Sequence, residues 1–125
     1  MDYEITVSKT CSYIIIKFYA PLTTAVACQC GPELVSLAAE NNVNRFLFDV
    51  RQSANTQSNA DNYFFANKDI GDFGFPRASL SAFLVCTDDT SHDFITTAFL
   101  NAGYMVKLFT DEETAVKWLE GGRER

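Results

Sequence analysis

The chain has 125 residues, the size of one domain, and 47% are hydrophobic against 21% charged, which excludes an intrinsically disordered chain. Its formal net charge of -6, with no run of Lys or Arg, argues against unassisted nucleic-acid binding, because the phosphate backbone is also negative. The N-terminus lacks the features of a signal peptide, and the longest apolar stretch, around Ile14 to Ile16, is too short to cross a bilayer, so we expect a cytoplasmic protein.

The first two predicted elements form a hairpin. Residues 3–8 alternate apolar and polar side chains, which is typical of a half-buried strand. Residues 11–19 are richer in β-branched and aromatic residues and predict a more deeply buried strand. Because only Lys9-Thr10 connects them, we expect the two strands to pair antiparallel at one edge of a sheet.

Helices and strands alternate in the middle of the chain. Apolar side chains at helical spacing predict a helix over 21–41, where Gly31-Pro32 indicates a kink or a division into two short helices. A short apolar run at 45–50 predicts a strand covered on both faces. A polar loop at 51–59 then leads into a helix over 59–70.

Two further strands and a helix follow. The strands are predicted at 80–86 and 105–109. Between them, Thr90 or Ser91 caps a helix that Gly103 is placed to end.

The last predicted helix has the clearest signals. Thr110 and Glu113 form a capping box, an apolar stripe with Trp118 at its edge faces the core, and Gly121-Gly122 ends the helix. The element order β-β-α-β-α-β-α-β-α predicts one α/β domain over residues 1–125. Its sheet is open and mostly parallel with an antiparallel N-terminal edge, and helices cover both faces.

Two segments carry a resemblance to a known family. A strand ends in Asp49-Val50-Arg51, and the closing strand and helix read Lys-Leu-Phe-Thr-Asp-Glu-Glu-Thr-Ala-Val-Lys-Trp-Leu from Lys107 to Leu119. In these features and in its element order the chain resembles the STAS-like, or SpoIIAA-like, domains related to bacterial anti-sigma-factor antagonists. In particular it resembles the branch grouped with CRAL-TRIO lipid-transfer modules.

The resemblance implies a bacterial regulatory protein that acts without catalysis. Antagonists of this group bind a partner kinase through the loop after the third strand and the following helix, and phosphorylation of a Ser or Thr there breaks the complex. The matching stretch, Asp49 to Phe65, lacks the Asp-Ser-Ser/Thr-Gly signature of the group. It offers as candidate phosphorylation sites Ser53, Thr56 and Ser58. CRAL-TRIO modules instead hold apolar ligands in a cavity.

The carboxyl ends of the parallel strands are where such sheets bind ligands. Ser58 is positioned to cap the helix after the third strand, and the same N–H groups could meet an anion. Asp49, Asp88 and Asp89 could converge on a magnesium ion, but Asp88 and Asp89 are also ordinary turn residues. His92 lies beside Ser91 and Asp93 on a predicted helix, where adjacent side chains do not face one another, so these three are not a catalytic triad.

The cysteines and glycines predict neither a metal nor a cofactor. No CxxC pair, glycine-rich phosphate loop or metal-ligand spacing occurs. We expect the four cysteines to be small, buried, unpaired side chains: Cys11, Cys28, Cys30 and Cys86.

An excess of aromatic residues follows the polar loop. Tyr63, Phe64 and Phe65 spread too widely around a helix to be buried together, and Phe73 and Phe75 follow. Such a surface is typical of a partner or ligand site unless the loop folds over it. We expect it to form a homodimer interface.

These observations favour a non-enzymatic protein-binding module. The predicted site residues are Arg51, Ser53, Thr56, Ser58, Tyr63, Phe64, Phe65, Phe73 and Phe75. An alternative is a carrier of a small apolar molecule or lipid, with a pocket among Tyr63, Phe64, Phe73 and Phe75. A third is an enzyme that uses the strand-end aspartates.

Overall fold

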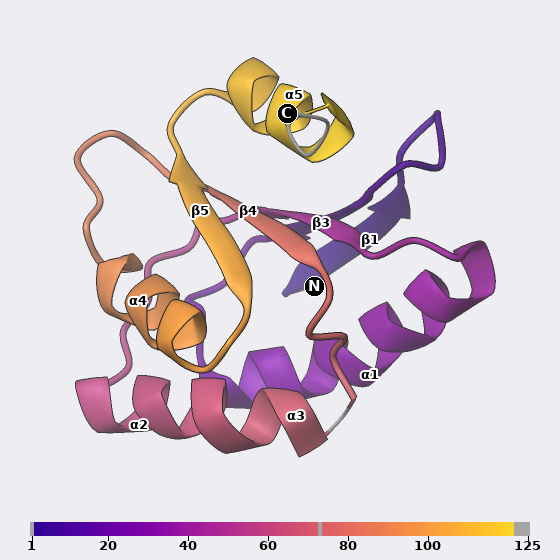
Figure 1. Ribbon diagram of the computed structural model, residues 1–125. Helices are drawn as coiled ribbons and strands as arrows, with labels where there is room; N and C mark the ends of the chain where they lie inside the picture. The colour runs from indigo at the N-terminus through magenta and orange to yellow at the C-terminus, as the bar shows by residue number, and fades with distance from the viewer. Residues whose placement is uncertain (1, 73, 122–125) are drawn as a thin grey trace.

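The computed structural model describes residues 2–72 and 74–121 and shows one five-stranded sheet (Figure 1). The strands are β1 (Tyr3–Val7), β2 (Ile14–Phe18), β3 (Arg45–Asp49), β4 (Leu80–Leu84) and β5 (Met105–Phe109). They lie side by side in chain order, with β1 antiparallel to β2 and each later pair parallel. The predicted open sheet with an antiparallel N-terminal edge is confirmed.

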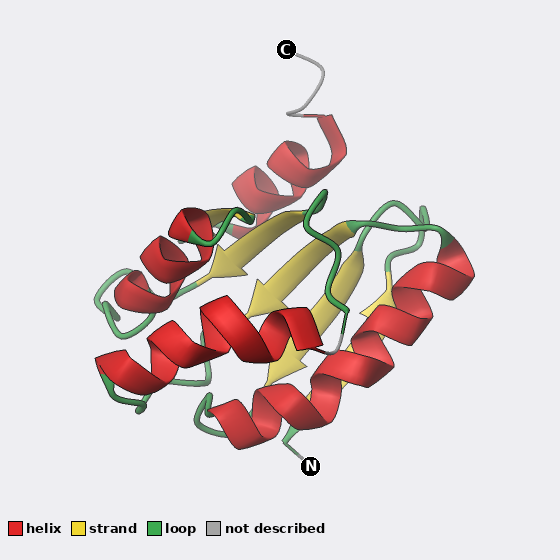
Figure 2. Cartoon of the chain, turned by 60° about the horizontal axis from the view of Figure 1, so that its bottom comes forward, coloured by secondary structure: helices red, strands yellow, loops and turns green. Residues whose placement is uncertain are grey.

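The helices lie on both faces of this sheet, as predicted. They are α1 (Thr24–Asn41), α2 (Asn59–Phe64), the π-helical turn η1 (Phe65–Asp69), α3 (Ile70–Asp72), α4 (Asp93–Asn101) and α5 (Glu112–Gly121). The α1 helix, the α2–η1–α3 segment and α4 cover one face, and α5 lies on the other (Figures 1 and 2). Each parallel strand lies on the same side of the one before it, and the crossover connections all have the same hand. The three connecting segments, α1, α2–η1–α3 and α4, therefore lie on the same face of the sheet.

Each face of the sheet has its own core. Phe46 and Leu47 are neighbours on β3, and because strand side chains alternate they point to opposite faces. Phe46 belongs to the larger core beneath α1, α2 and α4, whereas Leu47 packs with Ala115 and Leu119 of α5. None of the described helices is both long and apolar enough to cross a membrane.

The predicted first helix is one continuous element rather than two. Pro32 lies inside α1 and removes one helical hydrogen bond, but the helix continues because its buried side chains before and after the proline pack against the sheet. The helix begins at Thr24, later than predicted, since the Thr23 hydroxyl caps it by accepting from the Val26 N–H at 3.2 Å. Leu22 instead pairs with Asn55 in an isolated parallel bridge.

Two predicted helix caps are wrong. The α4 helix begins at Asp93 without a side-chain cap, because the Ser91 hydroxyl accepts from the Asn55 N–H. At α5 the cap is Asp111 rather than Thr110, and its carboxylate accepts from the N–H and hydroxyl of Thr114. Gly103 follows the end of α4, as predicted. Its φ of +102° is a conformation that glycine adopts without strain. Gly122 lies outside the described residues.

The prediction of four buried cysteines is also wrong. Only Cys30 is buried, whereas Cys11, Cys28 and Cys86 are exposed. Apolar neighbours in the sequence did not imply burial here, because Cys28 lies on the outer side of α1 and the other two lie in loops at strand ends. All four are free thiols.

Candidate functional site

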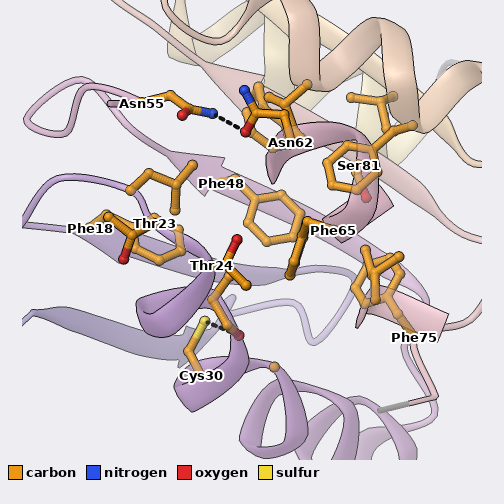
Figure 3. A pocket seen from close by; sticks show the side chains of 18 of the residues that line it. Phe18, Thr23, Thr24, Cys30, Phe48, Asn55, Asn62, Phe65, Phe75 and Ser81 are labelled. Atoms are coloured by element: carbon orange, nitrogen blue, oxygen red, sulfur yellow. Dashed lines mark hydrogen bonds between the residues drawn. The ribbon is translucent and has the colours of Figure 1, made fainter. Parts of the chain in front are cut away.

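A pocket lies between the sheet and the helices of its larger core. Its volume is about 70 Å³. Every helical segment on that face contributes to its wall, and so do strands β2 to β5. The pocket therefore lies inside the domain, at the layer where the helices cover the sheet (Figure 3).

Aromatic side chains form a large part of the wall. Six phenylalanines line the pocket: Phe18, Phe48, Phe65, Phe75, Phe83 and Phe99. Phe48 contacts its register partner Phe83 on the neighbouring strand, with ring centroids 5.1 Å apart, and Phe65 contacts Phe99, with ring centroids 5.9 Å apart. Such a wall stabilises an apolar occupant by removing its surface from water.

Uncharged polar side chains form one end of the pocket, where the loops after β2 and β3 meet. The Gln57 carboxamide accepts from the Thr24 N–H and donates to the Thr24 hydroxyl, each at 2.7 Å. Asn55 donates from Nδ2 to Asn62 Oδ1 at 3.1 Å, and Figure 3 shows these two side chains pointing toward one another. These contacts connect α1, the loop after β3 and α2 at one place.

Of the three consecutive aromatic residues at 63–65, Phe65 reaches the pocket, and it begins a π-helical turn. The Ile70 N–H donates to the Phe65 carbonyl, five residues earlier, so Phe65 and Ile70 lie one π turn apart and both line the pocket. Tyr63 and Phe64 remain outside it and are 55% and 61% exposed. The predicted pocket residues are therefore wrong for Tyr63 and Phe64, and Phe75 is placed in the wall, whereas Phe73 lies outside the described residues.

The loop between β3 and α2 places its predicted site residues in different environments. Ser58 caps α2, as predicted, because its hydroxyl accepts from the Asp61 N–H at 3.1 Å. Thr56 and Ser58 are exposed, but Ser53 is only 4% exposed and donates to the Ala20 carbonyl at 2.6 Å. Burial of this hydroxyl speaks against Ser53 as a phosphorylation site in the folded protein.

Arg51 lies with Asp49 on the opposite side of the sheet from the pocket, near α5. The guanidinium bonds both oxygens of the Asp49 carboxylate, at 3.0 and 2.9 Å, and reaches Glu112 at 3.5 Å. Burial raises the pKa of Asp49, but the hydrogen bonds from Arg51 outweigh it and leave the pKa lowered.

Of the other strand-end aspartates, Asp89 serves the turn before α4 and Asp88 is exposed. The Asp89 carboxylate accepts from the Ser91 N–H at 2.9 Å, which is the ordinary turn role that the sequence allowed. Within residues 2–72 and 74–121, no three His, Cys, Asp or Glu side chains come together as a metal site.

Sequence reasoning missed the structural role of His92. The ring is fully buried and packs against Phe83 of the pocket wall, with ring centroids 6.1 Å apart. Its Nε2 lies 2.9 Å from the Ser53 carbonyl, which connects the loop before α4 to the loop after β3. Its Nδ1 has no partner among the described residues.

Thr24, Asn55, Gln57 and Asn62 were also missed as pocket residues. Their contacts join positions as far as 33 residues apart, and the sequence gives no sign that these segments meet. The one available signal was the density of Asn and Gln in the loop at 51–59.

This arrangement defines an α/β domain of the SpoIIAA-like, or STAS-like, fold. A crystal structure of an uncharacterised DUF3478-family protein from Shewanella loihica PV-4, described as having a SpoIIAA-like fold, is similar to this chain with a TM-score of 0.58. Sequence identity is 20%, and the match covers 94% of this chain and 91% of that chain. The likeness confirms the predicted resemblance as a fold. No protein-family model and no curated protein matches the chain.

Proposed function

We propose that the protein binds a small apolar molecule in the pocket and does not transform it chemically. The observation that carries this proposal is the pocket with aromatic side chains in its wall that lies between the sheet and the helices, with a polar end formed by three chain segments. Ligand sites in proteins commonly combine an apolar wall with a few placed polar groups.

The chemistry of the wall supports binding rather than catalysis. Among the described residues, the wall contains no Asp, Glu, Lys, Arg or His. Its thiol, that of Cys30, is buried, and this burial raises its pKa to about 12. A thiol with that pKa stays protonated near neutral pH and is a poor nucleophile.

Native mass spectrometry of the gently purified protein tests this proposal. We expect a bound small molecule in the wild type that is lost in Ala27→Leu, since Ala27 lines the pocket and the longer side chain fills it. Ala25→Leu is the matched control, because Ala25 is exposed on the same helix. A wild-type protein that carries no small molecule and takes up no apolar probe contradicts the proposal.

A second candidate is a regulatory, protein-binding module, with the protein itself as the first partner to test. The supporting observation is the exposed pair Tyr63 and Phe64 on α2, whose rings lie 6.2 Å apart, a few residues after the exposed Thr56 and Ser58 in the sequence. Exposed aromatic side chains are typical of contact surfaces. Light scattering should show a dimer that Phe64→Asp weakens, and a monomer at high protein concentration contradicts self-association.

A further inference from the structure

The wall of the pocket contains no charge. Its described lining contains no Asp, Glu, Lys, Arg or His, and the strand-end ion pair of Asp49 with Arg51 lies on the α5 face of the sheet. Moving an unpaired ion from water into such surroundings costs far more than moving a neutral group. The pocket therefore discriminates against carboxylates, phosphates and ammonium ions.

Hydrogen bonds at the polar end leave donors unused. The backbone N–H of Gln57 donates to Asn55 Oδ1 at 3.0 Å, and this contact fixes which end of the Asn55 side-chain amide is the oxygen. Asn55 Nδ2 therefore faces Asn62 Oδ1, and the Asn62 Nδ2 group has no acceptor among the described residues. Asn62 is only 4% exposed and lines the pocket.

The Thr24 hydroxyl repeats this pattern. Its oxygen accepts from Gln57 Nε2, and its own hydrogen has no acceptor in the described part of the chain. Neither donor is fully sealed from the pocket and solvent: Thr24 is half-buried, and His92 Nδ1 is the one fully buried side-chain atom without a partner in the described part of the chain. Asn62 and Thr24 thus offer donors, at the same end of the pocket, to an occupant that has an acceptor oxygen.

The volume of the pocket limits the size of that occupant. At about 70 Å³ it exceeds the space that one water needs. It is about half of a ~150 Å³ apolar cavity that accepts benzene. A long lipid chain does not fit unless the helices move, whereas a short chain does.

We infer that the ligand is a short, uncharged molecule with an apolar body and an acceptor oxygen, such as an alcohol, ether, ester or amide. The body lies among the phenylalanines, and the oxygen accepts from Asn62 and Thr24. This inference rests on the proposed function, because it names the chemical class of molecule for the same pocket.

Titrations of the wild-type protein with four probes of one chain length test the inference. The probes are n-butanol, butanoate, butylammonium and n-butyl chloride, and binding is followed by NMR shifts of the pocket amides at neutral pH. We expect n-butanol to bind, and both ions to bind at least about tenfold more weakly. Lengthening the alcohol should raise affinity about fourfold per methylene until the cavity is filled.

Variants separate the donors from the wall. Asn62→Leu and Thr24→Val should each weaken n-butanol and leave n-butyl chloride unchanged, since that probe has no acceptor oxygen. Ala27→Leu should weaken both neutral probes, whereas Ala25→Leu should weaken neither.

The outcomes keep the two proposals apart. The inference about the ligand is overturned if the ions bind as tightly as n-butanol. It is also overturned if Asn62→Leu and Thr24→Val both melt as the wild type does and bind n-butanol normally. In either case the pocket remains a binding site. Failure of every neutral probe to bind, in a protein with wild-type melting, overturns the proposed function itself.

Discussion

The contact between Gln57 and Thr24 gives the sharpest prediction about stability. Thr24 N–H belongs to the first turn of α1, where backbone donors have no partner within the helix. Gln57 supplies that partner at 2.7 Å and bonds the Thr24 hydroxyl at the same distance. Gln57→Ala removes both hydrogen bonds, which are worth about 0.5–1.5 kcal/mol each.

We therefore expect Gln57→Ala to lower the free energy of unfolding by about 2 kcal/mol and the melting temperature by roughly 6–10 °C. Chemical denaturation and a thermal melt measure these changes. Gln52→Ala is the matched control, because Gln52 is exposed in the same loop and makes no side-chain hydrogen bond with the described residues. If Gln57→Ala melts with the wild type, or Gln52→Ala loses as much stability, the reasoning about this contact is refuted.

Three further predictions concern other parts of the chain. Ser58→Ala should cost about 1 kcal/mol of stability and Ser58→Asp almost none, because Asp also caps a helix. If Ser58 is a phospho-switch, Ser58→Asp should instead keep the fold and lose the partner in a pull-down. Because the pKa of Asp49 is lowered in the folded state, its ion pair with Arg51 stabilises the protein at neutral pH and does so less as the pH falls. The stability lost in Asp49→Asn, measured by denaturation at several pH values, should therefore shrink in acid, and a loss that does not depend on pH contradicts this. A thiol reagent should label the three exposed cysteines of the native protein and Cys30 only after unfolding, and native labelling of Cys30 contradicts its burial.

The architecture was predictable because burial leaves a periodic pattern in the sequence. The alternation in residues 3–7 and the short apolar run at 45–49 follow from strands covered on one or both faces. The order of those elements then leaves few topologies, since crossovers have one hand and neighbours in sequence pair in space.

Details that depend on a choice between near-equal local alternatives were not predictable. Thr110 and Asp111 are both good capping residues, and only the path of the chain after β5 selects Asp111. Likewise, Phe65 lines the pocket at the start of a π-helical turn while Tyr63 and Phe64 lie outside it, and no periodic pattern reports such a turn.

The pocket itself depends on contacts between distant segments. The Gln57–Thr24 pair joins residues 33 positions apart, and His92 contacts the carbonyl of a residue 39 positions away. Sequence reasoning therefore located the loop that closes the pocket but not the side chains that meet there.

The central claim, that this cavity accepts an apolar occupant, is tested most directly by a crystal structure of the protein under xenon pressure. Xenon binds in dry apolar cavities without needing a hydrogen bond. We expect a xenon peak among Phe48, Phe65 and Phe83, absent from Ala27→Leu and retained in Ala25→Leu. If side chains fill this space in the crystal and no xenon peak is found there, the claim that the cavity accepts an apolar occupant is contradicted.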